Sequence, residues 1–150
     1  MKIYQSKIVT TLVREVERKQ IRCSADIFEY IKDAFDDDLL QECVFVVMMN
    51  IRGYPKSYLL HSKGSQTDCI FNVRDILSAV LIARCTTFAV VHNHPSGDPA
   101  PSRADTKVTG ALREAADVVG LNFLDHIIVG DKDSLKDSEK FFSFVDAGLC

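Results

Sequence analysis

The stretch that decides the fold is residues 88–105, which read FAVVHNHPSGDPAPSRAD. Its first four residues are continuously apolar, which predicts a short strand buried on both faces. Three prolines and a glycine follow within residues 95–101 and exclude regular structure, so a stiff loop is predicted there. Ser102 is a favourable N-cap, so a helix should begin at Arg103. The stretch therefore predicts a strand, a rigid loop and a helix N-terminus in succession.

The rest of the chain continues this alternation of strands and helices. Apolar periodicity predicts further strands over residues 8–16, 43–49, 54–61, 121–129 and 141–145, with a turn at 50–53 and loops at 36–38 and 132–140. The same periodicity predicts three helices. The first has Ser24 as its N-cap and Ile27, Ile31 and Phe35 on one face. The second spans 73–83 with Ile76, Val80 and Leu81 inward, and the third spans 103–119 and ends before Gly120. Strands that alternate with helices indicate one α/β domain, a sheet flanked by helices, over residues 1–150.

Composition narrows the class of protein and of partner. A chain of 150 residues with 47% hydrophobic and 26% charged residues can bury a sizeable core as one soluble globular domain. Its 18 basic and 21 acidic residues give a net charge of −3, which does not support DNA as a partner. No run approaches the roughly 18 apolar residues of a membrane span, so no membrane partner is expected. The oligomeric state is left open.

The cysteines and the N-terminus indicate the compartment. The chain has five scattered cysteines and no C-x-x-C pair, which indicates neither a disulfide framework nor a cysteine zinc site. They are Cys23, Cys43, Cys69, Cys85 and Cys150. The N-terminus lacks the apolar core of a signal peptide. We therefore expect a cytoplasmic protein with reduced thiols.

Two histidines stand where the predicted central strand meets the loop. His92 and His94 are two residues apart, so on an extended chain both side chains point the same way. The loop then reverses the chain, and the next helix brings Asp105 back in its first turn. Two imidazoles and one carboxylate are typical of hydrolytic zinc, with a water in the fourth position. The sequence therefore predicts one zinc ion per chain, held by His92, His94 and Asp105.

Each of these residues taken alone also has an ordinary structural explanation. An aspartate early in a helix, as at position 105, suits the helix dipole, and Ser102 alone is a common cap. Asp98 is either a substitute ligand or a turn residue, and its setting favours the turn. Asp125 and His126 precede an apolar strand and are interpreted as structural residues or as partners that orient the ligands. The combination, and not any single residue, favours the metal site.

The same residues resemble a known family. The spacing from His92 to Asp105, H-x-H-P-x6-S-x-x-D, resembles the JAMM (MPN-plus) metalloprotease motif. The longer string HNHPSGDP over residues 92–99, followed by Pro101, Ser102, Arg103 and Asp105, resembles the RadC branch of that superfamily, a RadC-like JAB domain. So do DHIIVG over residues 125–130 and SFVDAG over 143–148. The resemblance extends from about residue 8 to the C-terminus.

The resemblance implies both a fold and residue roles. The fold is the JAB/MPN fold, a mixed sheet with helices on both sides and an architecture related to that of cytidine deaminases. By position in the motif, His92, His94 and Asp105 match the zinc ligands, and Ser102 matches a residue that helps to stabilise the tetrahedral intermediate. Glu42, at the head of the strand over 43–49, matches the glutamate that hydrogen-bonds the zinc water. A carboxylate there can pass a proton to a leaving amine, although alone it also suits a polar strand boundary.

Three functions follow as hypotheses. The first is a zinc-dependent hydrolase, a metallopeptidase or isopeptidase that cleaves an amide bond in an unidentified protein or peptide. The second is a DNA-repair role, since RadC relatives carry that name; longer relatives have a helix-hairpin-helix region upstream, which this chain is expected to lack. The third is a non-catalytic MPN scaffold, whose known members typically lack the ligands. A zinc deaminase is disfavoured because its H-x-E and P-C-x-x-C signatures are absent.

Overall fold

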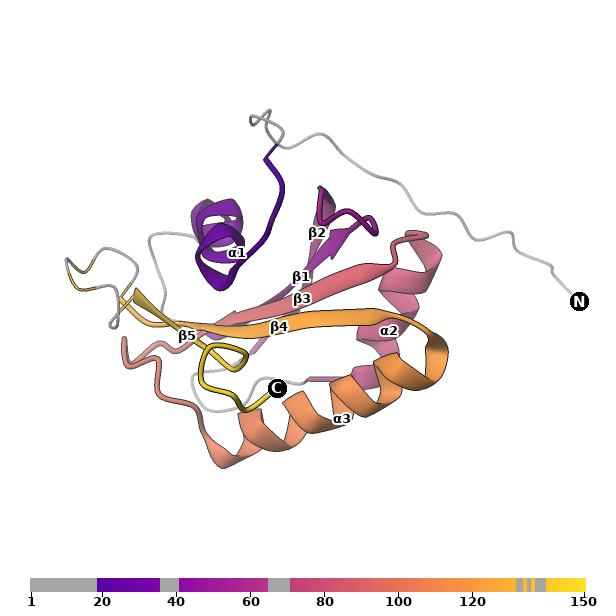
Figure 1. The fold of residues 1–150 in the computed structure, drawn as a ribbon. Helices are drawn as coiled ribbons and strands as arrows, with labels where there is room; N and C mark the ends of the chain where they lie inside the picture. Colours follow the sequence, from indigo (N-terminus) through magenta and orange to yellow (C-terminus); the bar gives the residue numbers. More distant parts are fainter. Residues whose placement is uncertain (1–18, 36–40, 65–70, 132–133, 135, 137–139) are drawn as a thin grey trace, which may run out of the picture.

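The apolar run predicted at residues 88–91 forms the central strand of a mixed sheet (Figure 1). The computed structural model describes residues 19–35, 41–64, 71–131, 134, 136 and 140–150. Within them, the elements are α1 (Ser24–Ile31), η1 (Lys32–Ala34), β1 (Cys43–Met49), β2 (Pro55–Lys63), α2 (Val73–Ile82), β3 (Thr87–Asn93), α3 (Arg103–Val119), β4 (Asn122–Val129) and β5 (Phe141–Ser143). The strand order is β2-β1-β3-β4-β5.

The pairing of β3 explains why its sequence is apolar throughout. β3 pairs antiparallel with β1 and parallel with β4, and α3 makes the crossover between β3 and β4. Every residue of β3 is buried, as expected for a strand with a neighbour on each edge and helices on both faces. Its C-terminal end, where His92 lies, is therefore held on both sides.

Helices cover the two faces of the sheet, with α1 on one face and α2 and α3 on the other (Figure 1). Alternate residues of β1 divide between two cores, because side chains alternate across a strand. The core on the α1 side contains Ile27, Phe28, Ile31, Phe45, Val47 and Ile127; the core on the α2–α3 side contains Val44, Val46, Ile76, Val80, Phe88 and Leu112. The predicted mixed sheet with flanking helices, the JAB/MPN architecture, is confirmed.

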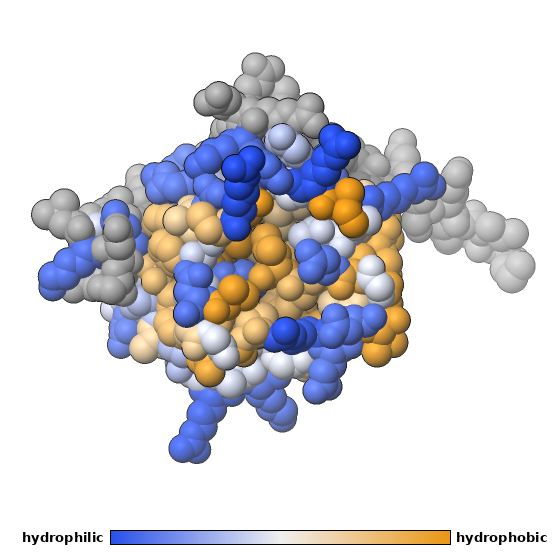
Figure 2. Space-filling view, viewed as in Figure 1, coloured by the Kyte–Doolittle hydropathy of each residue, from blue (hydrophilic) through white to orange (hydrophobic). Residues whose placement is uncertain are grey.

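The exposed surface is mostly polar around the helices. Figure 2 shows hydrophilic residues above and below a region rich in hydrophobic ones on the face viewed in Figure 1. The C-terminal segment after β5 lies on this face, and it carries the half-exposed side chains of Val145 and Leu149. Among the described residues, no helix is long and apolar enough to cross a membrane.

The helix predictions hold with corrections in α1 and α2. α1 ends at Ile31 and is followed by η1, so Phe35, which was predicted on the same helical face, lies after both, and α2 ends one residue early, at Ile82. α3 spans residues 103–119 as predicted and ends at Gly120, and Ser102 is its N-cap. The N-cap of α1, however, is Cys23. Ser24 is the first residue of the helix, and its hydroxyl donates to the Asp146 carboxylate. Leu81 was predicted to point inward but is 49% exposed. Each helical residue turns by about 100°, so Leu81 lies beyond the face that Val80 buries.

The strand predictions hold with small shifts of boundary. β1 matches the predicted range, β2 and β4 begin one residue later than predicted, and β2 extends two residues further. β5 ends two residues early because the chain turns after Ser143, where Ala147 N–H donates to the Ser143 carbonyl. The predicted strand over 8–16, the loop over 36–38 and most of the loop over 132–140 lie outside the described residues.

Two glycines of α3 allow a matched test of its C-terminal end. Gly120 has a φ of 72°, and no atom lies within 4 Å of the position of an added Cβ; Gly110, inside the helix, is equally open. Gly120→Ala is expected to destabilise the protein by about 1–2 kcal/mol, because a left-handed backbone costs an L-residue that much. Gly110→Ala is expected to stabilise it by about 0.5–1 kcal/mol. Urea denaturation measures both, and shifts of the same sign would contradict the left-handed end.

Candidate metal centre

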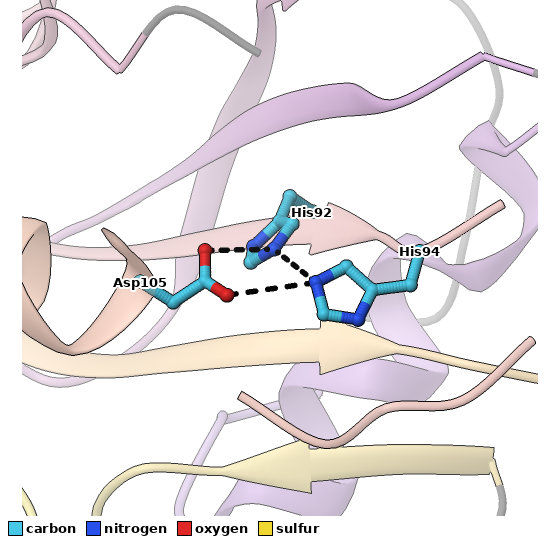
Figure 3. Close-up of side chains that lie close together, drawn as sticks. All are labelled: His92, His94 and Asp105. Carbon is cyan, nitrogen blue, oxygen red and sulfur yellow. Dashed lines mark hydrogen bonds and ion pairs between the residues drawn. The ribbon is translucent and has the colours of Figure 1, made fainter. Parts of the chain in front are cut away.

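The three predicted ligands meet at the C-terminal end of β3 (Figure 3). His92 is the next-to-last residue of β3, His94 follows the strand, and Asp105 lies in the first turn of α3. One ligand atom from each lies within 4.8 Å of the others. His92 Nε2 is 3.2 Å from His94 Nε2 and 3.3 Å from Asp105 Oδ1, and His94 Nε2 is 3.6 Å from Asp105 Oδ2.

These separations fit a tetrahedral metal ion. Zinc binds nitrogen and oxygen ligands at about 2.0–2.2 Å, which places neighbouring ligand atoms of a tetrahedron about 3.3–3.6 Å apart. The distances from His92 Nε2 to His94 Nε2 (3.2 Å) and to Asp105 Oδ1 (3.3 Å) are close to that edge, and His94 Nε2 lies 3.6 Å from the other carboxylate oxygen, Oδ2. A metal ion held by these three side chains would have a fourth position left for a water or a substrate oxygen.

The proline loop orients His94. Its Nδ1–H donates to the backbone carbonyl oxygen of Asp98 at 2.8 Å, because a carbonyl can only accept. Gly97 N–H donates to the His94 carbonyl at 3.0 Å, and the Asp98 carboxylate accepts from Ala100 N–H. The loop therefore leaves the Nε2 lone pair of His94 directed at the centre. Asp98 takes part through its backbone, in a turn, and not as a ligand in this arrangement.

A buried hydrogen-bond chain orients His92. Thr109 Oγ1 donates to the Asp105 carbonyl at 2.6 Å, so it must accept from His126 Nδ1–H at 2.6 Å. His126 Nε2 then carries the lone pair and accepts from His92 Nδ1–H at 2.9 Å. Each link determines the tautomer of the next, and the Nε2 lone pair of His92 is left facing the centre.

The protonation of these groups favours a cation at the centre. Burial lowers the pKa of His126 well below its ordinary 6.5, so the imidazole of His126 stays neutral, as the hydrogen-bond chain from Thr109 to His92 requires. The hydrogen bond with Asp105 raises the pKa of His94 above 6.5. A proton is therefore the competitor of a metal ion at His94, and metal affinity should fall as the pH falls. Two imidazole lone pairs and a carboxylate oxygen facing one another require a proton or a metal ion between them.

Asp105 presents one oxygen to the centre and uses the other for the helix cap. Burial by itself would raise the pKa of Asp105, but its interactions with His92 and His94 and the hydrogen bond from the Ser102 hydroxyl outweigh burial and hold that pKa well below 3.8. Its Oδ2 accepts from both the backbone N–H and the hydroxyl of Ser102. Oδ1, 3.3 Å from His92 Nε2, is thus the oxygen placed to bind a metal ion.

Ser102 is first of all the predicted N-cap. Its hydroxyl accepts from Asp105 N–H at 3.1 Å, and its backbone N–H donates to Asp105 Oδ2 at 2.8 Å, which completes a capping box. The Ser102 hydroxyl also donates to the Asp105 carboxylate. Its hydroxyl lies beside the centre, but its hydrogen is directed at Asp105. A role for Ser102 toward a substrate would require this hydrogen to rotate away from Asp105.

Glu42 comes to the same place from a distant part of the chain. It precedes β1, and the antiparallel register aligns Val44 with His92. Glu42 Oε1 lies 3.9 Å from His92 Nε2, and the Glu42 side chain is 17% exposed. It is therefore close enough to contact a water on a metal ion at the centre, from the side that solvent reaches.

The remaining predicted residues have structural roles that the hydrogen bonds identify. Asp125 accepts from His126 N–H, Val145 N–H and the Ser143 hydroxyl, so it attaches the C-terminal segment to the sheet. Burial raises the pKa of Asp125. His61, for which the sequence indicated no role, accepts from Asn72 N–H at the start of α2.

Sequence reasoning missed Thr109, Phe71 and Asn93. Thr109 lies one helical turn after Asp105, and that i,i+4 spacing was the available signal. Phe71 packs edge-on against both His92 and His126, with ring centroids 5.2 and 5.4 Å away. Asn93 stands between the two ligand histidines, yet its side chain contacts the segment that contains Glu42. The last two contacts depend on tertiary structure and have no local sequence signal.

A Thr109→Val variant tests the buried chain. It removes the acceptor of His126 Nδ1–H while keeping the shape, so the tautomer of His92 is no longer determined. Zinc affinity, measured by competition with a chromophoric chelator, is expected to fall by about 10–100-fold. Thr106→Val is the matched control. The Thr106 hydroxyl also donates to the carbonyl four residues before it, that of Ser102, but Thr106 lies on the exposed side of α3. Equal zinc affinities of the two variants would contradict the role of the hydrogen-bond chain from Thr109 to His92.

Comparison with known proteins identifies the family. Residues 21–149 match the family model described as RadC-like JAB domain. A UPF0758 protein of Chlorobaculum parvum is 34% identical over 136 residues, 91% of this chain and 57% of the relative. One from Staphylococcus epidermidis is 33% identical, over 88% of this chain and 55% of the relative. One from Geobacter sulfurreducens, UPF0758 protein GSU0386, is 44% identical, over 59% of this chain and 35% of the relative.

The match is to part of these proteins. The chain spans less than three fifths of the length of each of these curated relatives. The family model covers the sheet, its helices and all three candidate ligands. This chain belongs to the RadC-like JAB domain family.

Proposed function

We propose that this domain is a zinc-dependent hydrolase that cleaves an amide bond in a peptide or an isopeptide-linked protein. The observation that carries the proposal is the convergence of His92 Nε2, His94 Nε2 and the Asp105 carboxylate, with separations of 3.2–3.6 Å and with Glu42 beside them. This is the donor set of hydrolytic zinc, three protein ligands and an open position.

Each residue has a distinct role in the proposal. A bound zinc ion supplies Lewis acidity and lowers the pKa of its water to about 7. His92, His94 and Asp105 hold the ion. Glu42 accepts the proton of the attacking water and delivers it to the leaving amine nitrogen. Ser102, once its hydroxyl hydrogen turns from Asp105, donates to the oxyanion of the tetrahedral intermediate.

The exposure of these side chains indicates the direction of substrate approach. His92 is fully buried, whereas His94 and Glu42 are 19% and 17% exposed. The open position is therefore reached from the side of His94 and Glu42, at the surface of the domain. A site that is reached from the surface of the domain suits an extended peptide or a protein tail.

Metal removal and reconstitution test the proposal. The purified protein is expected to contain one zinc ion per chain by elemental mass spectrometry and to hydrolyse members of a panel of peptides and isopeptide-linked ubiquitin-like proteins. A chelator should abolish hydrolysis, and one equivalent of zinc should restore it. A protein that binds no divalent metal would overturn the proposal and favour a binding scaffold.

A further inference from the structure

The backbone pairing of β1 with β3 ends at the candidate ligand His92, and the side chain of the next residue continues it. The last backbone pair is Val44 with His92. At the next position, Asn93 Oδ1 accepts from Cys43 N–H at 2.8 Å, and Asn93 Nδ2 donates to the Gln41 carbonyl at 3.1 Å. The side-chain amide thus has the bonding pattern of a peptide group in a strand, one acceptor and one donor.

The chain needs this substitute because β3 turns away. His94 N–H donates to the Val129 carbonyl of β4, and the proline loop then begins. Residues 41–43 thereby lose the backbone partner that a longer β3 would provide. On the other edge, Gly64 N–H donates to the Glu42 carbonyl at 2.9 Å. The backbone of Glu42 is thus held from β2 directly and from β3 through Asn93, which bonds both of its neighbours.

The position of Asn93 between two ligands is consistent with this role. Side chains alternate across a strand, so Asn93 points to the face opposite that of His92 and His94 and does not compete for a metal ion. Asn93 is completely buried, and both of its polar atoms have partners. A buried amide that bonds only backbone, on both sides of one residue, serves to hold that residue.

We propose that Asn93 is a positioning residue that holds Glu42 over the metal centre. The inference rests on the proposed function, because Glu42 matters only if a metal-activated water is present. Neither Ala nor Ser at position 93 can reach both Cys43 N–H and the Gln41 carbonyl. Without these bonds the segment that contains Glu42 can shift, and a displacement of about 1 Å can cost about a hundredfold in rate.

The experiment compares Asn93→Ala with Glu42→Gln and with Asn50→Ala. Asn50 is the matched control, because its side chain accepts from Arg52 N–H and Tyr54 N–H in the turn at the other end of β1. The probes are zinc content, the pH midpoint of the visible spectrum of the Co²⁺-loaded protein, and hydrolysis of a substrate from the panel. The Co²⁺ midpoint reports on Glu42 without requiring turnover.

Asn93→Ala is expected to bind one metal ion, to shift the Co²⁺ midpoint in the same direction as Glu42→Gln, and to hydrolyse about a hundredfold more slowly. Asn50→Ala should keep the wild-type midpoint. Adding Asn93→Ala to Glu42→Gln should produce little further loss, because the two residues act through one carboxylate. If Asn93→Ala does not fold, Asn93→Asp, which keeps the oxygen that accepts from Cys43 N–H, replaces it.

The outcomes separate the two proposals. A wild-type midpoint in Asn93→Ala, with a shifted one in Glu42→Gln, would overturn the role of Asn93 and leave the proposed function intact. So would additive losses in the double variant. A Glu42→Gln variant that matches the wild type in midpoint and rate would overturn the roles of Glu42 and Asn93 and leave the zinc hydrolase intact. No metal binding by the wild type would overturn both proposals.

Discussion

Glu42→Gln is expected to retain one zinc ion per chain and to lower the hydrolysis rate by about 10²–10⁴-fold. Glutamine has nearly the same shape but cannot accept a proton, so the water is no longer activated and the leaving amine is not protonated. Glu42 is not among the three ligands, and its Oε1 lies 3.9 Å from the nearest ligand nitrogen, so metal binding should survive. The loss should appear in kcat more than in KM, because the proton transfer is made in the transition state.

The measurement is steady-state hydrolysis by zinc-loaded variants, with metal content determined on the same samples. Glu29→Gln is the control, since Glu29 on α1 makes an exposed ion pair with Lys32 and lies outside the candidate centre. It should keep the wild-type rate, because surface ion pairs contribute little. A Glu42→Gln variant as active as Glu29→Gln would show that another group moves the proton.

His92→Ala combined with His94→Ala is expected to remove zinc completely, from one ion per chain to none. The substitutions leave Asp105 as the one remaining ligand, and its Oδ2 is already bonded to Ser102. Zinc held by several protein ligands is bound with about 10–16 kcal/mol in small structural sites, and a lone carboxylate has almost none of this. Zinc should therefore raise the melting temperature of the wild type and not that of the double variant.

Elemental mass spectrometry and thermal denaturation with and without zinc check this result. His61→Ala is the control, because His61 lies on β2 and accepts a hydrogen bond from Asn72 N–H, outside the candidate centre. It should keep its zinc and its zinc-dependent shift. Full zinc occupancy in the His92/His94 variant would place the ion elsewhere and exclude the proposed ligand set.

The parts of this fold that could be predicted are those that depend on sequence patterns only a few residues long. The range of β1, the whole of α3 and the end of α3 at Gly120 match the prediction, because apolar runs, caps and glycines act within a few residues. Ser24 and Leu81 were misplaced for a related reason. A cap is decided by which backbone leaves the helix, and the inward face is decided by what packs against it; neither is a property of one residue type.

The candidate metal centre likewise has one part that local sequence patterns predict and another that they do not. His92, His94 and Asp105 lie within one strand–loop–helix unit, so residue spacing, proline stiffness and the N-cap Ser102 predict their convergence from the sequence alone. His126 is 34 residues from His92, and Asn93 is 50 from Cys43. These contacts exist because the sheet places β1 and β4 on the two edges of β3. Glu42 reaches the centre the same way, and only its match to a family motif pointed to it in advance.

The sequence alone therefore predicts the central strand, the stiff loop and the helix after it. It also predicts that the three side chains carried by these elements meet at one point. Only the tertiary structure decided which lone pairs face that point, through the chain from Thr109 to His92, and what holds Glu42 beside it. The physical reason is that hydrogen-bond direction and strand order depend on partners far along the chain, whereas helix caps, proline stiffness and strand alternation act between near neighbours.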